Sequence, residues 1–518
     1  MKTIKDFYLQ NRRFLCLYFL LYVLVYGFIS LRFGMSVDDC SDLDIPGAKG
    51  HYVYLACGRW FVAAYRWVFG YGACPLASGI MAGVFLSISL VLQTNLLKLN
   101  STLERCAYGV LYLCCIQWIW VQRFCLITDT SALACLMCTA AVILLRNPGW
   151  RPLLSSVLLV CCAMAAYQIF FLYFVVLWLA VELGNCIRGE GTHPNLLRLA
   201  RPAAVLVLAA VSWVAAKHII IAISCVPQAT LDGVNTYNSN MTSWPGFFEL
   251  SMHDKMMLLG HHVLYSGLAV FGKNLCGLVH TGQWVYTTAL LPAVLLVWMG
   301  WKRLGAVSGL KIAAYVASML YLPFSVALIL LWSWAPTRVF IAEPLVPAAL
   351  WGIWLGAAHL RGNARAIAWA GIAFICMKGM YYGSILGTNE AYYFRTSMQE
   401  LNHMYLRGQQ VGRECGCPDC EIIIAGNTKE MMGYDEVARM REHGLLLGQA
   451  SPYAFNNGTV VFNAYAHYER LPRLRLATPE EAKKYRTKLE TMADWPSDNS
   501  VAAEDGIVLI RLGPPSEE

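Results

Sequence analysis

Residues 153–183 read LLSSVLLVCCAMAAYQIFFLYFVVLWLAVEL. This run is too long for one upright transmembrane helix, which needs about 20 apolar residues, and rather short for two. It fits either one long tilted helix or two short helices that meet at Tyr167 and Gln168. The choice decides how often the chain crosses the membrane, and therefore which of its loops share a side.

The basic residues of the loops favour two crossings by this run. Cytoplasmic loops of membrane proteins carry an excess of Lys and Arg. If the N-terminus is cytoplasmic and 153–183 crosses twice, the basic loops fall on one side; they hold Lys98 and Arg105, Arg146 and Arg151, Arg188, Arg198 and Arg201, Lys302, Arg303 and Lys311, and Arg361 and Arg365. We therefore expect about eleven spans, near 14–33, 76–97, 106–121, 129–145, 153–165, 168–183, 202–224, 285–300, 312–334, 339–359 and 366–386. An odd number places the C-terminal region outside the cytoplasm.

The composition agrees with a chain that is solvated by lipid. Of its 518 residues, 58% are hydrophobic and 14% charged, against about 25% charged in soluble domains. Mean hydropathy is +0.49. The net charge of +8 comes mostly from residues between apolar runs or in the C-terminal region, and no basic face typical of nucleic-acid binding emerges. The sequence thus predicts an all-α polytopic protein of the bilayer.

Two domains are expected. Residues 1–387 form the transmembrane domain, with a first outer loop at 34–75 and a long outer loop at 225–284. Residues 388–518 form a small extracytoplasmic α/β domain, because their apolar stretches are short. Strands are predicted at Ile422–Ala425, 459–462 and 506–512, and a helix at 478–492 with Pro479 at its first position.

Two groups of residues after the first span could carry chemistry. Asp38 and Asp39 lie in the densest acidic cluster of the membrane half. Adjacent carboxylates can act as bases, as metal ligands or as acceptors for sugar hydroxyls, or can simply belong to a solvated loop. Arg59, in Gly58-Arg59-Trp60, suits bidentate binding of a phosphate, or anchors the chain among lipid headgroups.

Further candidates follow along the chain. Arg123 and Asp129 lie in the tight outer turn between the third and fourth spans, where they either pair with each other or serve function, because ionisable residues at this depth are costly. Tyr167 and Gln168 stand at the break in 153–183, and irregular backbone at membrane depth survives only inside protein or beside a wet cavity. Arg338 begins the tenth span and could meet a phosphate or a headgroup.

Metal and nucleotide sites are not predicted. No His or Cys spacing gives a credible zinc signature, so no cofactor is expected and a divalent metal has no support. Cys415, Cys417 and Cys420 read as a disulfide element outside the cytoplasm, which leaves one of the three for a partner such as Cys40, Cys57 or Cys276, or unpaired. Neither a Walker motif nor a Rossmann fingerprint occurs, which argues against transport driven by ATP.

The order of these features resembles the bacterial glucosyltransferase Gtr type II family, within the wider GT-C class of polytopic glycosyltransferases. The resemblance covers about residues 10–385, and the Asp38-Asp39 pair followed by Gly58-Arg59-Trp60 carries most of it. It implies a polyprenyl-phosphate-linked sugar donor, with glucose as the sugar, and a cell-surface glycan as acceptor. It also implies that Asp38 or Asp39 is the catalytic carboxylate, at the outer face of the cytoplasmic membrane.

The remaining candidates then become substrate-binding residues. Arg59, Arg123 and Arg338 are expected near the departing phosphate. Asp129, Tyr167 and Gln168 are the other expected contacts. Two alternatives stay open: a non-enzymatic polysaccharide flippase or transporter, which should show repeats and polar residues at the midplane, and a surface-polymer polymerase or ligase, for which the loop at 225–284 leaves room.

Overall fold

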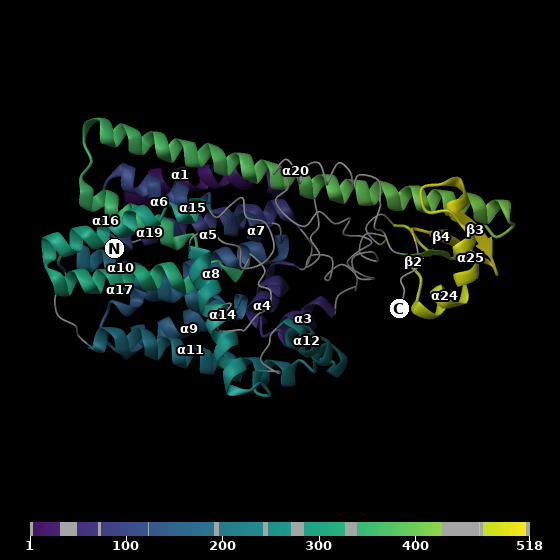
Figure 1. Ribbon diagram of the computed structural model, residues 1–518, viewed down its shortest axis with the longest axis horizontal. Helices are drawn as coiled ribbons and strands as arrows, with labels where there is room; N and C mark the ends of the chain where they lie inside the picture. Colours follow the sequence, from purple (N-terminus) through teal and green to yellow (C-terminus); the bar gives the residue numbers. More distant parts are fainter. Residues whose placement is uncertain are drawn as a thin grey trace. The chain divides into compact units, whose positions relative to one another are not determined.

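The computed structural model describes residues 4–31, 49–70, 74–122, 124–190, 196–241, 247–270, 284–326, 339–426, 466 and 470–513 (Figure 1). The chain divides into two compact units, Met1–Leu31 with His51–Ser384 and Arg32–Gly50 with Ile385–Glu518, so one division falls between Ser384 and Ile385. This position lies inside one continuous helix, α20 (Gly362–Glu414). The helix therefore runs well beyond the end of the expected span at 366–386.

The first unit is helical throughout its described parts. Its helices, besides the start of α20, are α1 (Ile4–Leu31), α3 (Lys49–Ala56), α4 (Trp60–Phe69), α5 (Pro75–Leu96), α6 (Thr102–Leu113), α7 (Ile116–Gln122), α8 (Cys125–Leu145), α9 (Trp150–Ala166), α10 (Phe170–Ile187), α11 (Leu196–Ile223), α12 (Gln228–Met241), α14 (Met252–Val270), α15 (Trp284–Thr287), α16 (Leu290–Leu304), α17 (Ala306–Tyr321), the 3-10 turn η1 (Leu322–Phe324) and α19 (Leu345–Ala358). Figure 1 shows α9 beside α11, and these two helices are in contact.

Seven helices among the described residues are long and apolar enough to cross a membrane. They lie in Lys5–Leu31, Pro75–Leu96, Leu126–Leu145, Phe170–Ile187, Ala200–Ile223, Val285–Leu304 and Ala306–Phe324. The apolar helices α9 and α19 are shorter, and the expected spans 106–121 and 366–386 contain no helix that qualifies. A membrane protein follows from these helices, whereas the number of eleven spans is not confirmed.

Residues 153–183 form parts of two helices. Helix α9 ends at Ala166, Tyr167 is extended (φ −158°, ψ 125°), and α10 begins at Phe170. The Phe170 and Leu172 N–H groups donate to the Tyr167 and Ile169 carbonyls, at 3.0 Å each. The break is therefore hydrogen-bonded within itself, and the single tilted helix is excluded.

The expected third span is also broken, which the sequence did not predict. Helix α6 ends at Leu113 and α7 begins at Ile116. The Tyr26 hydroxyl donates to the Leu113 carbonyl at the C-terminal end of α6. This carbonyl therefore has a hydrogen-bond partner although the helix stops there. The Cys115 thiol donates to Gln117 Oε1 at 2.8 Å and supports the start of the next helix.

A buried polar network joins the helices of this unit. Gln93 of α5 is fully buried, and its Nε2 lies 2.8–2.9 Å from the hydroxyls of Ser89, Thr139 and Tyr173. The Tyr108 hydroxyl donates to Gln93 Oε1 at 2.8 Å. These contacts link α5, α6, α8 and α10. Interhelical hydrogen bonds of this kind specify packing where lipid removes the hydrophobic drive between helices.

The second unit contains a small sheet. Its strands are β1 (Ile422–Ala425), β2 (Leu474–Leu476), β3 (Val501–Glu504) and β4 (Ile507–Arg511), in the order β2-β1-β4-β3. Strand β1 pairs parallel to β2 and β4, while β3 is antiparallel to β4. The predicted strands at 422–425 and 506–512 correspond to β1 and β4, and the one predicted at 459–462 lies outside the described residues.

Helices cover both faces of this sheet, because its strands are apolar on both sides. Ile422 and Ile424 pack with Val508, Ile510 and the C-terminal part of α20. Ile423 faces the other way and packs with Tyr485, Leu489 and Met492, in and beside α25 (Arg486–Thr491), which follows α24 (Pro479–Lys484). Together these two short helices replace the single helix predicted at 478–492.

Candidate functional site

The turn between α3 and α4 is built around Gly58. Gly58 has a φ of 74°, which glycine adopts at no steric cost, and α3 ends at this turn. The Gly58 N–H donates to the Leu55 carbonyl at 2.9 Å, and the Arg59 N–H donates to the Tyr54 carbonyl at 2.7 Å. This pair of bonds is a Schellman motif. Arg59 is consequently held at the N-cap of α4.

Distant segments hold this turn in place. Gln168, in the α9–α10 break, donates from Nε2 to the Cys57 carbonyl at 2.5 Å. The Arg59 guanidinium carbon lies 4.7 Å from the centre of the Tyr167 ring. The structure thus brings together three residues that the sequence singled out separately. We call residues 57–59 with Tyr167 and Gln168 the Arg59 corner.

Helix α11 adds a second cation to the Arg59 corner. Trp213 Nε1 donates to the Gly58 carbonyl at 2.9 Å. A Cβ atom on Gly58 would lie 3.1 Å from Lys217 Cδ, so the half-buried Lys217 side chain runs past this turn. Lys217 was absent from the predicted site, although a lysine within the expected span at 202–224 is the signal that marks functional residues in membranes.

Asp129 forms an ion pair with Arg66 of α4. Arg66 Nη2 lies 2.5 Å from Asp129 Oδ1, and each side chain is 4% exposed. Arg66 Nε also donates to the Leu126 carbonyl at 3.0 Å, and the Thr130 N–H donates to Asp129 Oδ1 at 2.8 Å. Arg123, which the sequence offered as a partner for Asp129, lies outside the described residues, and the partner that the structure shows is Arg66. The pair attaches α4, which begins at the Arg59 corner, to α8.

Glu343 is a buried acidic residue that was not among the predicted site residues. It is fully buried just before α19, and its Oε2 accepts a hydrogen bond from Gln117 Nε2. Its Oε1 has no hydrogen-bond partner among the described residues. The signal was present, since Glu343 lies inside the expected span at 339–359. This bond connects α7 to the segment that follows Arg338.

Four predicted site residues lie outside the described residues: Asp38, Asp39, Arg123 and Arg338. Of the residues that the structure describes, no three His, Cys, Asp or Glu side chains are grouped so that they could hold a metal ion.

The Arg59 corner has the chemistry of an anion site. A guanidinium keeps its N–H donors in its own plane when it stacks on a ring, and there an anionic oxygen can accept them. A lysine ammonium supplies a second, mobile charge. An arginine beside an aromatic ring, with a lysine side chain running past the same turn, is an arrangement that can neutralise a phosphate as it gains negative charge.

Comparison with known proteins gives one family. The model of the family described as "Glucosyl transferase GtrII" matches residues 15–351, which begin within α1 and end halfway through α19. No curated protein and no solved structure matches the chain. The matched region contains every residue of the Arg59 corner, together with Arg66, Asp129, Lys217 and Glu343.

Proposed function

Because this chain belongs to the glucosyl transferase GtrII family, we propose that it transfers glucose from a polyprenyl-phosphate donor to a cell-surface glycan, at the outer face of the cytoplasmic membrane. The family and the apolar helices fit a membrane glucosyltransferase. The donor, the acceptor and the GT-C relationship belong to the proposal. A lipid-borne donor is supported by the lack of nucleotide-binding motifs in the sequence.

The proposed chemistry is a direct displacement. An acceptor hydroxyl oxygen attacks the anomeric carbon, the bond from that carbon to the phosphate oxygen breaks, and the phosphate leaves with the electron pair. Asp38 or Asp39 accepts the hydroxyl proton as general base. One displacement inverts the anomeric centre.

The Arg59 corner supports the placement of the leaving group. Arg59 and Lys217 would neutralise the departing phosphate, with Arg123 and Arg338 as further expected contacts. Tyr167 would position Arg59 by stacking, at 4.7 Å. The single observation that carries this assignment is the meeting of Arg59 with Tyr167 and Gln168, which come from two distant regions of the sequence.

The decisive experiment replaces the proposed base. Purified Asp38→Asn and Asp39→Asn variants are assayed for transfer from a synthetic polyprenyl-phosphate glucose to a glycan acceptor. We expect one of them to lose at least about a hundredfold in rate, the usual contribution of general base catalysis. Asp42→Asn and Asp44→Asn are matched controls from the same acidic stretch and should retain activity. Full activity in both test variants refutes the carboxylate mechanism.

An extracytoplasmic C-terminal domain is part of the proposal. It is supported by the loop charges and by the disulfide between Cys417 and Cys420, since disulfides persist in oxidising compartments. Cys415 is a free, exposed thiol in the same segment. A membrane-impermeant maleimide should label it in intact spheroplasts, with Cys415→Ser as control. Labelling that requires lysis would place the domain in the cytoplasm.

The transport alternative gives a different result in the same preparation. A flippase moves its lipid-linked substrate without making a glycosidic bond. Transfer of labelled glucose to the acceptor by the purified chain in detergent, where no second compartment exists, therefore supports the enzyme and rules against a flippase.

A further inference from the structure

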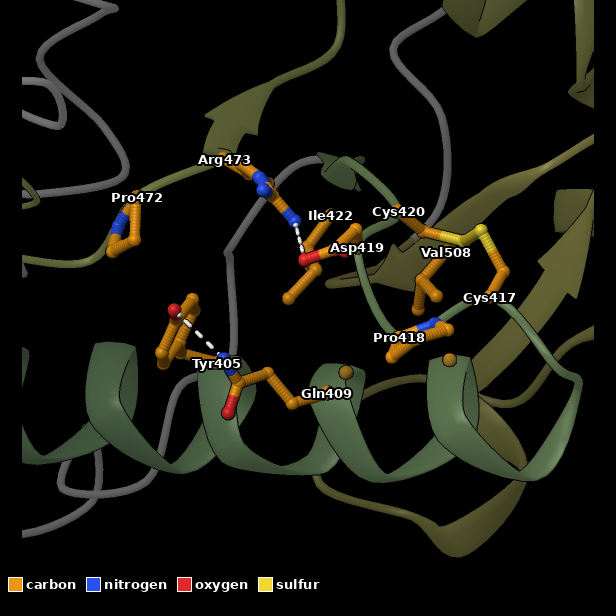
Figure 2. A pocket seen from close by; sticks show the side chains of 12 residues that line it. Tyr405, Gln409, Cys417, Pro418, Asp419, Cys420, Ile422, Pro472, Arg473 and Val508 are labelled. Carbon is orange, nitrogen blue, oxygen red and sulfur yellow. Dashed lines mark hydrogen bonds and ion pairs between the residues drawn. A yellow bond between two sulfur atoms is a disulfide. The ribbon is translucent and has the colours of Figure 1, made fainter.

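The second unit contains a polar pocket that the proposed transfer reaction does not use. Its volume is about 210 Å³, and it lies between one face of α20 and the amino ends of β1 and β2 (Figure 2). Tyr405 and Gln409, one turn apart on α20, form one wall. Asp419 and Arg473, from the segments before β1 and β2, form the opposite wall.

The pocket is built on a close contact between α20 and the sheet. A Cβ atom on Gly408 would lie 2.9 Å from Ile422, and one on Gly412 would lie 2.8 Å from the Cys417 carbonyl oxygen. Glycine at these two positions lets the helix approach β1 and the loop before it. Ile422 and Val508 pack beneath the pocket and are almost fully buried. The exposed rings of Pro418 and Pro472 supply apolar surface at its edge.

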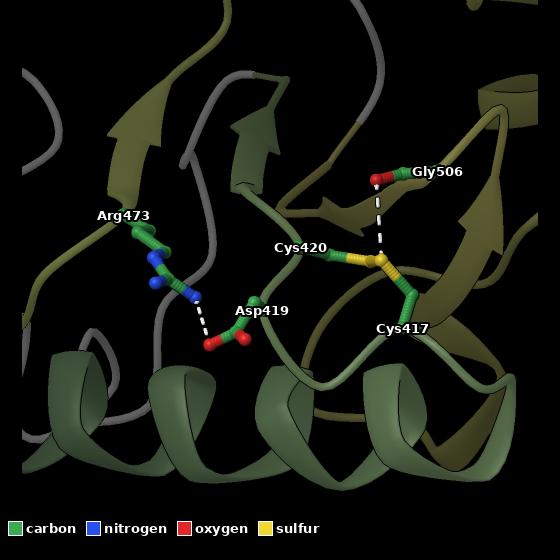
Figure 3. Close-up of a disulfide and its surroundings, with 5 residues drawn as sticks. All are labelled: Cys417, Asp419, Cys420, Arg473 and Gly506. Carbon is green, nitrogen blue, oxygen red and sulfur yellow. Dashed lines mark hydrogen bonds and ion pairs between the residues drawn. A yellow bond between two sulfur atoms is a disulfide. The ribbon is translucent and has the colours of Figure 1, made fainter.

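A disulfide fixes the loop that carries Asp419. Cys417 and Cys420 are bonded to each other on either side of it, and Figure 3 shows the Asp419 carboxylate held beside Arg473 next to this bridge. Asp419 Oδ1 lies 2.5 Å from Arg473 Nη1. The Arg473 backbone has a φ of 67°, which few non-glycine residues adopt. The bridge restrains the backbone of this wall, and the ion pair that joins its two segments is exposed, with 49% of the Arg473 and 84% of the Asp419 side chain accessible.

The polar groups offer both donors and acceptors. Gln409 Nε2 donates to the Tyr405 hydroxyl at 2.8 Å. That bond leaves the Tyr405 hydroxyl proton to donate and Gln409 Oε1 to accept, by the capacity of these groups. The Asp419 and Arg473 charges cancel within the pair, so the pocket as a whole favours a neutral ligand over a free anion or cation.

We propose that this pocket binds one neutral sugar residue of a glycan. A hexose matches it because each hydroxyl both donates and accepts, while the C–H face of the ring is apolar and suits Tyr405 and the exposed rings of Pro418 and Pro472. The volume lies below the roughly 300–1,000 Å³ typical of sites for drug-sized ligands, which fits one sugar unit. The claim that the pocket binds a sugar does not depend on the proposed function. The further claim that this sugar is part of the acceptor does depend on it.

The test measures sugar binding by the full chain in nanodiscs. Methyl α-glucoside, α-mannoside and α-galactoside are titrated by calorimetry and by saturation-transfer NMR, and inorganic phosphate is titrated as an anion probe. At least one glycoside should bind. Tyr405→Ala and Arg473→Gly should each weaken that binding about tenfold, as expected for loss of a stacking surface or of hydrogen bonds to a charged group.

Two controls separate a lost ligand contact from a damaged fold. Gln410→Ala alters the neighbouring exposed residue of α20, whose amide donates to Glu414, and should change affinity less than twofold. Arg473→Gly places glycine where the backbone already has a positive φ, so its thermal unfolding midpoint should not fall by more than a few degrees.

Three results overturn the inference. They are glycoside binding that is equal in wild type, Tyr405→Ala and Arg473→Gly; no glycoside binding at all; and phosphate binding, lost in Arg473→Gly, in its place. A parallel transfer assay keeps the two proposals distinct. Transfer without glycoside binding at this pocket removes only the inference, whereas binding without transfer removes only the proposed function.

Discussion

Removing one partner of the buried Arg66–Asp129 pair should destabilise the first unit strongly. Each side chain is 4% exposed, and the N–O distance is 2.5 Å. Breaking a buried ion pair from one side costs about 3–5 kcal/mol, because a charge is left without its partner. Asp129→Asn should reach this range, since the Arg66 guanidinium cannot lose its proton. Arg66→Met should cost less, about 2–3 kcal/mol, because a carboxyl group can be neutralised by a proton instead.

The double variant separates the pair from its surroundings. Arg66→Met/Asp129→Leu removes both charges, and such replacements are often neutral or stabilising. We expect it within about 1 kcal/mol of wild type. Together with the Asp129→Leu single variant, which should cost about as much as Asp129→Asn and completes the cycle, this gives a coupling energy of roughly 6 kcal/mol. Stability is read from unfolding by SDS in mixed micelles, followed by circular dichroism and tryptophan fluorescence.

A second ion pair of the same length serves as the control. Lys98 and Glu190 also lie 2.5 Å apart, but their side chains are 38% and 47% exposed. Lys98→Met should therefore cost less than about 1 kcal/mol. Two results would refute the strong effect expected of burial. One is a stability cost of Asp129→Asn no larger than that of Lys98→Met, and the other is a cost of the double variant equal to the sum of the costs of its two single variants.

Three further predictions concern other parts of the chain. Gly58→Ala should destabilise the protein more than Gly189→Ala. Both glycines have a φ above 70°, but a Cβ atom on Gly58 would meet Trp213 at 2.7 Å, whereas one on Gly189 would meet no atom within 4 Å. The difference between the SDS unfolding midpoints of the two variants measures that clash. The pKa of Glu481 is lowered to about 2 in the folded protein, chiefly by its hydrogen bond from Arg475, against about 4.3 in the unfolded chain. This carboxylate therefore stabilises the folded state above about pH 4.3, and the stabilisation is lost as the pH falls toward about 2. Thermal unfolding between pH 5 and 2 should show this loss, and a Glu481→Gln variant that keeps the same pH slope contradicts it. Glu343→Gln should change stability by less than about 1 kcal/mol, while Glu343→Ala should cost about 2–5 kcal/mol by leaving a cavity and an unpaired amide, with unchanged stability of the alanine variant as the contrary result.

The parts of the fold that depend on local pattern were predictable. Strand β1 was predicted with its observed bounds, because four apolar residues between polar neighbours fit a short buried strand. The Thr478 cap was signalled by Pro479 and by Glu481, which completes the capping box. The break near Tyr167 followed from the length of the apolar run together with the loop charges. Each of these inferences needed only neighbouring residues or the span count.

Contacts between distant helices were beyond the sequence. Arg66 and Asp129 are 63 residues apart, and nothing in the sequence indicates that these two residues pair. The break after Leu113 was missed because an apolar run has the same pattern whether the helix is continuous or interrupted. Lys217 and Glu343 could have been predicted as site residues, since each is an ionisable residue in an apolar span. Only the fold shows that one lies beside Gly58 and the other against Gln117.

The backbone at the α9–α10 break satisfies its own hydrogen bonds, through carbonyls of residues 167 and 169. Those bonds do not depend on which side chains occupy the break. New residues at Tyr167 and Gln168 can therefore be tried without loss of the two helices, which makes these neighbouring codons an economical pair to randomise in a library that selects for a changed sugar preference.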